Sequence, residues 1–454
     1  MKCIKPLIRL IATIILLNLF MGCTANAPYH IVRHTEGNCR NLLIDSSNCR
    51  NSYYQEYDHY DLAFAEFTDR GNTFSDTIIN DILEKVREKV DDDGAIIIVF
   101  VHGWKHNSHE LDENLNSFKR TLSFISKNIS NVLIGERRVI GLYIGWRGAS
   151  FDIPLFDNLT FWTRQDVAED VGDGGVNRLI MNLDAIIEQR DQSAMVVIGH
   201  SFGGAMVVAA LTEILADRFS QYTRSNKEIA NGVGDAVIVL NPAIQANKIL
   251  PLIDIAVNAQ YQPQQPPIFI SLSSDDDLAT HLAFPIGQVL ASLTGPDQLS
   301  ISRSYLYDRA DTTRQVYLNE KDLDNTTVGN YAPFLTHRIL ATKTGSQIQV
   351  SVNTCDDVPE ECALSAQASI QGFPAIKAPK HFPLYFFKTD RSIMRGHGDM
   401  FNARTMAFIV CVIVDAIKLK SQHKIQALGS AKSIFSDLTS LEHNMEYILN
   451  YSRD

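Results

Sequence analysis

The chain has 454 residues, of which 45% are hydrophobic and 20% are charged, and its formal net charge is −11 at pH 7. This composition is typical of a globular protein with a sizeable core, so no large part of the chain need be disordered. The acidic excess argues against nucleic acid or anionic lipid headgroups as the main partner, because a strongly negative surface repels both.

Residues 1–22 have the pattern of a secretory signal peptide, with a basic start and an apolar run over 10–21 that is too short to span a membrane comfortably. The run ends in Gly22-Cys23, which resembles the lipobox of bacterial lipoproteins. That resemblance implies an exported protein whose acylated Cys23 is the mature N-terminus, and Thr24 resembles the pattern sent to an outer membrane. Cleavage at a nearby small residue and an uncleaved anchor remain the alternatives.

Four further cysteines form two local pairs, Cys39 with Cys49 and Cys355 with Cys362, while Cys411 falls inside an apolar helical segment. Two local pairs and a buried leftover fit two disulfides in an oxidising compartment. Free thiols or a metal site are the alternatives, but neither pair has Cys-x-x-Cys spacing. We therefore predict two disulfides.

Residues 23–58 are polar and without a clear period, which predicts a tether or irregular decoration. A loosely alternating segment predicts a strand over 60–67, and apolar residues at helical spacing predict a helix over 75–90. Residues 95–101 are a continuous apolar run, the pattern of a strand buried on both faces of a parallel sheet.

The predicted strand over 95–101 is followed by His102-Gly103-Trp104. His102, His106 and His109 have the spacing of metal ligands on one helical face. Gly103 and Trp104 disfavour a helix there, and no carboxylate-bearing signature accompanies the histidines. A loop without metal is the preferred interpretation.

A helix is predicted over 110–128, a strand over 139–146, and another helix over 174–189. Between them, 149–170 is an aromatic insertion at the end of a strand, with Phe151, Phe156, Phe161 and Trp162. These side chains could form a lid or an acyl-binding wall, or could pack on the sheet edge. Both interpretations stay open.

The most informative stretch is a buried strand that runs into Gly199-His200-Ser201-Phe202-Gly203 and continues as a helix. Strand, Gly-x-Ser-x-Gly and helix together are the context of a nucleophile elbow, in which the serine sits on a sharp, strained turn. Gly199 and Gly203 would supply space where a Cβ would collide with neighbouring backbone.

These residues resemble the α/β-hydrolase superfamily of serine esterases and lipases, and most closely its poorly characterised bacterial members. The resemblance implies an α/β fold with a doubly wound, mostly parallel sheet, helices on both faces, and Ser201 as nucleophile. It also implies an oxyanion hole from the backbone N–H groups of Trp104 and Phe202, with no cofactor. The fold would cover residues 59–420.

In this superfamily the acid and then the histidine follow the serine in the chain. After a predicted strand at 236–240, the strand at 268–272 leads into three consecutive acids, Asp275, Asp276 and Asp277. By resemblance we choose Asp277 as the acid, with Asp275 second, since the acid usually stands a few residues past the strand.

The base is assigned in the same way. His397 lies between Gly396 and Gly398, after a late apolar strand at 384–387 and before an apolar helix at 403–417. This setting matches the family's base. The rivals His281 and His337 lack the setting, His381 precedes the strand, and the His200 side chain would leave the elbow in a different direction from Ser201.

About 120 residues separate Asp277 from His397, so an insertion of unknown shape occupies about 278–380. Its segment 330–334 offers candidate pocket-wall residues. The tail 421–454 is predicted to be a helix packed on the core or on this insertion.

Together these observations favour a membrane-tethered serine hydrolase that cleaves a small or lipid-like carboxylic ester through an acyl-enzyme. No metal, cofactor or nucleic acid is expected. Amide or thioester cleavage would use the same residues. The alternative from another class is a non-catalytic envelope lipoprotein of the same fold that acts as a binding module, because a fold does not guarantee a reaction.

Overall fold

The computed structural model describes residues 27–32, 51–132, 137–148, 161–188, 190–225, 227–280, 284, 300–307, 312–354, 379–423, 433, 435 and 438–451. Several sequence predictions lie outside these residues: the signal peptide with Cys23, both cysteine pairs, and the aromatic residues Phe151 and Phe156. Cys411 is described, and its thiol is buried and free.

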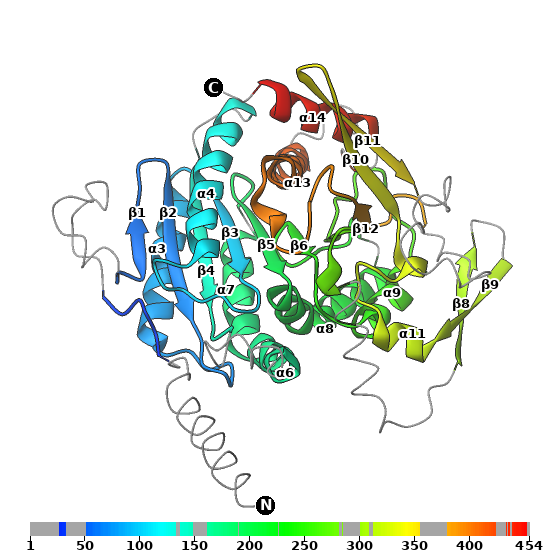
Figure 1. Cartoon of the computed structure of the whole chain (residues 1–454), viewed down its shortest axis with the longest axis horizontal. Coiled ribbons are helices and arrows are strands. Elements are labelled where there is room, and N and C mark those ends of the chain that lie inside the picture. The colour runs from blue at the N-terminus through cyan, green and yellow to red at the C-terminus, as the bar shows by residue number, and fades with distance from the viewer. Residues whose placement is uncertain are drawn as a thin grey trace, which may run out of the picture.

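Ten strands of the described chain form one sheet with helices on both faces (Figure 1), in the order β1-β2-β4-β3-β5-β6-β7-β12-β10-β11. Every pairing from β2 to β10 is parallel, and only β1 and β11 at the two edges run antiparallel to their neighbours. The strands of this sheet are β1 Tyr54–Glu56, β2 Tyr60–Glu66, β3 Ala95–Val101, β4 Arg138–Gly145, β5 Ala194–His200, β6 Ala236–Leu240, β7 Phe269–Ser274, β10 His337–Thr344, β11 Gln347–Thr354 and β12 Leu384–Thr389.

Helices α3, α6, α7, α8 and α9 cover one face of the sheet, and α4, α13 and α14 cover the other. The bounds of these helices are α3 Asp76–Asp92, α4 Glu113–Val132, α6 Phe161–Val171, α7 Asn177–Ile187, α8 Phe202–Arg224, α9 Leu250–Ala256, α13 Ala403–His423 and α14 Leu438–Tyr451. A further short helix, α11 Glu320–Asn325, lies in the insertion after β7. A membrane-crossing helix, judged by length and hydropathy, is not found among the described residues.

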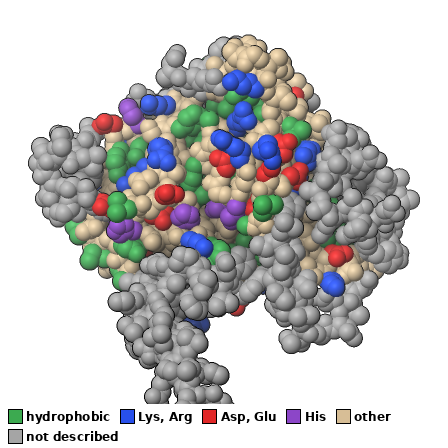
Figure 2. Space-filling view, viewed as in Figure 1, with side chains coloured by type: hydrophobic (Ala, Val, Ile, Leu, Met, Phe, Trp, Pro, Cys, Tyr) green, Lys and Arg blue, Asp and Glu red, His purple; other side chains and the backbone are tan. Residues whose placement is uncertain are grey.

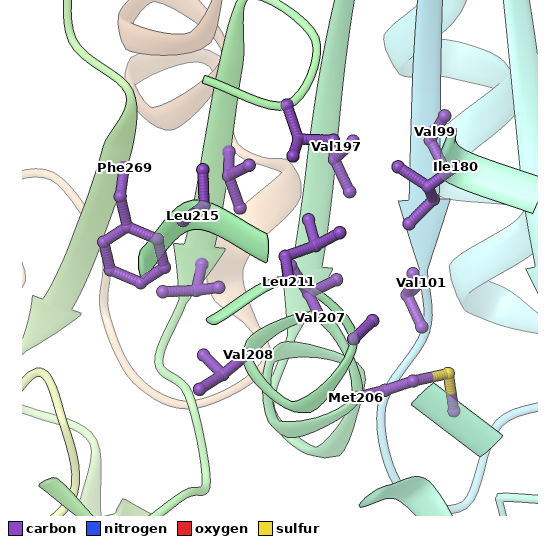
Figure 3. Packing of buried hydrophobic residues seen from close by; sticks show 14 of the residues in the cluster. Val99, Val101, Ile180, Val197, Met206, Val207, Val208, Leu211, Leu215 and Phe269 are labelled. Atoms are coloured by element: carbon purple, nitrogen blue, oxygen red, sulfur yellow. The ribbon is translucent and has the colours of Figure 1, made fainter. Parts of the chain in front are cut away.

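The central strands are apolar on both faces because helices cover both faces of the sheet. In β3 the side chains of Ile97, Val99 and Val101 point to the α8 face, whereas Ile96 and Ile98 point to the α4 face. Figure 3 shows Val99, Val101 and Val197 of β5 meeting side chains of α7 and α8, namely Ile180, Met206, Val207 and Leu211. This packing fixes α8 against the strand that precedes it.

The predicted α/β fold, with its mostly parallel sheet flanked by helices, is confirmed, and this arrangement is consistent with an α/β-hydrolase-like fold. Some features differ from the sequence predictions or were not predicted. Strand β1 lies in the segment predicted to be irregular, and β7 and β12 each continue two residues further than predicted, to Ser274 and Thr389. The insertion at 278–380 holds a hairpin, β8 Ser300–Tyr307 with β9 Thr312–Asn319, and a second hairpin, β10 with β11, that extends the main sheet.

The C-terminal helix α14 packs along the edge strand β11 and satisfies its outward backbone groups. Val350 N donates to Glu446 Oε1 at 2.8 Å, and Val352 N donates to Glu442 Oε1 at 2.6 Å. Asn450 both accepts from Ile348 N and donates to Ile348 O, at 2.8 Å each. Because an unpaired strand edge is a template for association with another chain, α14 protects this edge.

We predict that the double substitution E442A/E446A lowers the free energy of unfolding by about 2 kcal/mol, because two backbone donors lose charged acceptors. It should also increase self-association in size-exclusion chromatography. The variant E446Q keeps the acceptor oxygen and should stay close to the wild type, as should H443A, which changes an exposed residue of the same helix. Equal urea midpoints for E442A/E446A and the wild type would contradict the protective role.

Candidate active site

The candidate site lies where strands β5, β7 and β12 end on the same edge of the sheet. Ser201 joins β5 to α8 and has φ 56° and ψ −119°, a backbone conformation that residues other than glycine rarely adopt. The surrounding backbone holds it there: Ser201 N donates to Leu240 O at 3.1 Å, and Ser201 O accepts from Ala205 N and Ala243 N at 3.1 Å each. The elbow predicted from the Gly-x-Ser-x-Gly pattern is therefore present as a strained turn.

Three glycines make this turn sterically feasible. A Cβ on Gly199 would lie 2.6 Å from Gly203 O, and a Cβ on Gly203 would lie 2.1 Å from Val101 O. A Cβ on Gly103 would lie 2.9 Å from Ser201 Cβ. All three contacts are closer than real Cβ atoms allow, so the loop after β3 and the elbow can pack together only with glycine at these positions.

The structure brings together the three side chains that the sequence predicted as nucleophile, base and acid. His397 Nε2 lies 2.7 Å from Ser201 Oγ, and His397 Nδ1 lies 2.9 Å from Asp277 Oδ2. In this arrangement Nδ1–H donates to the carboxylate and Nε2 accepts the serine hydroxyl. Ser201 and Asp277 are buried, whereas the His397 side chain is 31% exposed, so the site is open to solvent at the imidazole.

The face of the molecule seen in Figure 2 carries histidine side chains near its middle, beside acidic and basic side chains.

Asp277 is the only one of the three consecutive acids that contacts His397 in the described structure. Its Oδ1 accepts from Ala279 N and Thr280 N, and its Oδ2 also accepts from Thr280 Oγ1 at 2.6 Å. Burial alone would raise the pKa of this carboxyl, but the hydrogen bonds from His397 and Thr280 outweigh burial and lower it. Asp277 is therefore held as a carboxylate.

The other two acids form ion pairs elsewhere. Asp275, the second choice from sequence, pairs with Arg338 at 2.9 Å and Lys388 at 3.3 Å, and Asp276 pairs with Arg391 at 2.7 Å.

Sequence reasoning missed the residues that fix the loop carrying His397. Asn241, buried at the end of β6, accepts from Ser274 N and donates to the carbonyl oxygens of Gly396 and His397 at 3.2 Å each. His200 Nε2 lies 2.7 Å from His397 O, so that nitrogen carries the proton. The positive φ of 42° at Asn241 suits asparagine, and the Asn-Pro pair after an apolar strand was its only signal in the sequence.

His102 has a structural role. It is fully buried, its Nε2 accepts from Trp146 N, and its backbone oxygen accepts from Trp146 Nε1 at 3.0 Å. His106 instead pairs with Asp112 at 3.2 Å. The segment 102–109 contains no helix, so these histidines do not share a helical face, and no cluster of three potential metal ligands occurs within the described residues.

The remaining candidates are placed as follows. His337 stacks on Tyr385 and Phe387 in the core, and His381 precedes β12, so neither replaces His397; His281 is outside the described residues. Trp104 follows Gly103, and its ring lies 6.2 Å from the Phe202 ring. The candidate wall residues Tyr331 and Phe334 are buried, and Phe334 packs on Phe386 of β12.

No protein-family model matches the chain, and no curated protein matches it. Among solved structures, the chain is similar to the phospholipase PlaB from Legionella pneumophila in complex with thio-NAD, with a TM-score of 0.30 and 12% sequence identity. The match covers 78% of this chain and 62% of the phospholipase chain, so the chain spans less than two thirds of that protein's length.

Two buried histidines make the stability of the site region depend on pH. Burial lowers the pKa of His102 to about 4, and burial together with the neighbouring His397 lowers the pKa of His200 to about 3. Both rings are therefore neutral in the folded protein at pH 5, whereas in the unfolded chain they take up protons below the ordinary value of 6.5.

We predict that the free energy of unfolding falls as the pH is lowered from 6.5 to 5, by roughly 2 kcal/mol for each of these histidines. Urea unfolding at several pH values measures the slope, and H102Q, which cannot titrate, should show a shallower one. A free energy of unfolding that stays constant over this range would contradict the neutral, buried state of both rings.

Proposed function

We propose that the protein is a serine hydrolase that cleaves carboxylic esters through an acyl-enzyme. The observation that carries this proposal is the chain of two hydrogen bonds from Ser201 through His397 to Asp277 at a strained elbow. A serine is a weak nucleophile near neutral pH and needs a base that is itself oriented by a third group. The lowered pKa of Asp277 suits that third role.

In the proposed reaction, Ser201 Oγ attacks the ester carbonyl carbon while His397 Nε2 takes its proton. The tetrahedral intermediate collapses as the imidazolium returns that proton to the departing alcohol, which leaves an acyl group on Ser201. Water then attacks the acyl-enzyme by the same steps and releases the acid. Asp277 stabilises the imidazolium through Nδ1 and keeps the ring in its tautomer.

The oxyanion of each intermediate would accept hydrogen bonds from the backbone N–H groups of Phe202 and Trp104. Phe202 is the first residue of α8, so the helix dipole also favours negative charge there. The tight contact of Gly103 with Ser201 brings the Trp104 backbone beside the elbow. Each such donor is worth on the order of 10² to 10³ in rate.

We predict that the wild type hydrolyses a short p-nitrophenyl ester and is labelled by a fluorophosphonate, and that S201A abolishes both. D277N should lower kcat on the order of 10⁴-fold, because the amide favours the wrong imidazole tautomer. The control S225A changes a serine just past the far end of α8 and should retain full activity and labelling.

Labelling that survives S201A would reject Ser201 as the nucleophile. A folded wild type that neither hydrolyses esters of any acyl length nor reacts with fluorophosphonates would favour the alternative, a non-catalytic envelope binding module.

We further propose that the enzyme is exported and tethered to a membrane of the cell envelope through acyl chains on Cys23. The support is the sequence pattern of a basic start, a short apolar run and Gly22-Cys23. Several acyl chains anchor a protein firmly, whereas one chain gives only reversible binding.

The tether predicts that a clickable palmitate analogue labels the full-length chain in a Gram-negative host and that the protein fractionates with membranes. C23S should lose the label and leave the membrane fraction, and C411S is the matched control because Cys411 is buried in α13. Equal labelling of C23S and the wild type would contradict lipidation at Cys23.

A further inference from the structure

Behind the candidate acid lies a chain of polar side chains, buried at Thr280 and Lys388 and half-buried at Asn330, that the reaction described above does not use. Thr280 Oγ1 donates to Asp277 Oδ2 at 2.6 Å, on the same oxygen that His397 contacts. Asn330 Nδ2 donates to Thr280 Oγ1 at 3.2 Å, and Lys388 Nζ donates to Asn330 Oδ1 at 2.5 Å. The chain therefore joins β12 and the 326–331 segment of the insertion to the acid.

The ammonium group of Lys388, at the end of this hydrogen-bond chain, determines the direction of every hydrogen bond in it. An ammonium group can only donate, so Asn330 presents its carbonyl oxygen to Lys388 and its amide nitrogen to Thr280. Thr280 Oγ1 then accepts from Asn330, and its own proton is directed to the Asp277 carboxylate. Asn330 also donates to Thr327 Oγ1 at 2.8 Å, which holds the amide in this orientation.

Charge and burial agree with this direction. The Lys388 side chain is 1% exposed and pairs with Asp275, which in turn pairs with Arg338. Burial lowers the pKa of Lys388 to about 8, although the carboxylates of Asp275 and Asp277 act in the opposite direction. At neutral pH the end of the chain is a cation, and in a low-dielectric interior linked hydrogen bonds strengthen one another.

We propose that Thr280, Asn330 and Lys388 are positioning residues that hold the Asp277 carboxylate turned toward His397. This inference rests on the proposed function. The backbone donors Ala279 N and Thr280 N fix Asp277 Oδ1, and the hydrogen-bond chain that ends at Lys388 fixes Oδ2 through Thr280. Thr280 acts on the acid directly, and Asn330 and Lys388 act through Thr280.

The test is a double-mutant cycle on purified full-length protein with a p-nitrophenyl ester as substrate. T280V removes the hydroxyl at nearly constant volume and should lower kcat about tenfold with KM unchanged, because a hydrogen bond to a charged group is lost. T280S restores the hydroxyl and should restore kcat. N330D keeps the acceptor for Lys388 but cannot donate to Thr280, and the new carboxylate competes for the threonine proton.

N330D should therefore lower kcat several-fold in the wild-type background and have no further effect in T280V, since contacting residues on one path are not additive. T121V changes a buried threonine of α4 and should leave kcat unchanged. If T280V does not fold, N330D, which replaces an amide by a carboxylate of nearly equal volume, still tests the hydrogen-bond chain through its several-fold loss of kcat.

Two results would overturn the inference while S201A remains inactive: a T280V variant within twofold of the wild type in kcat, or an N330D effect of equal size in both backgrounds. An S201A variant as active as the wild type would instead reject the proposed function itself. The two failures are therefore distinguishable.

Discussion

The close contact of backbone around Ser201 is the constraint on which the rest of the structure depends. Gly203 lies against Val101 O of β3, Gly199 lies against the first turn of α8, and Gly103 lies against Ser201 itself. These contacts bring the ends of β3 and β5 together with the start of α8. The strain at Ser201 persists because apolar packing of β5 and α8 on both sides determines the path of the backbone.

Asp277 and His397, the candidate acid and base, are positioned differently from Ser201. Neither belongs to a regular element at its reacting end, and both lie in loops after the strands β7 and β12. Side chains replace secondary structure there: Asn241, His200 and Ser274 hold the backbone around His397, and Thr280 holds the carboxylate of Asp277. The backbone at Ser201 is thus positioned by packing, whereas Asp277 and His397 are positioned by hydrogen bonds.

Local pattern was enough to predict the central sheet, since β3, β5 and β6 are continuous apolar runs between polar loops. The choice of Ser201, Asp277 and His397 came from the resemblance to a family, and these residues meet because they follow parallel strands that end on the same edge. The pattern could not predict the pairing of β10 and β11 with the sheet, since β10 joins the sheet through β12, about 50 residues later, and the edge of β11 is covered by α14, about 90 to 100 residues later. Asn241 and Lys388 were missed for the same reason, because their partners are distant in sequence.

The strand order has a consequence for how the candidate site responds to partial unfolding. β5, with Ser201 at its end, has four strands on one side and five on the other, so we expect its amide protons to exchange only through extensive opening. β12, which leads to His397, is separated from the outer edge by only β10 and β11. Opening that begins at that edge would displace the loop of His397 while β5 is still paired on both sides, so the hydrogen bonds of the candidate site would break before the sheet as a whole unfolds.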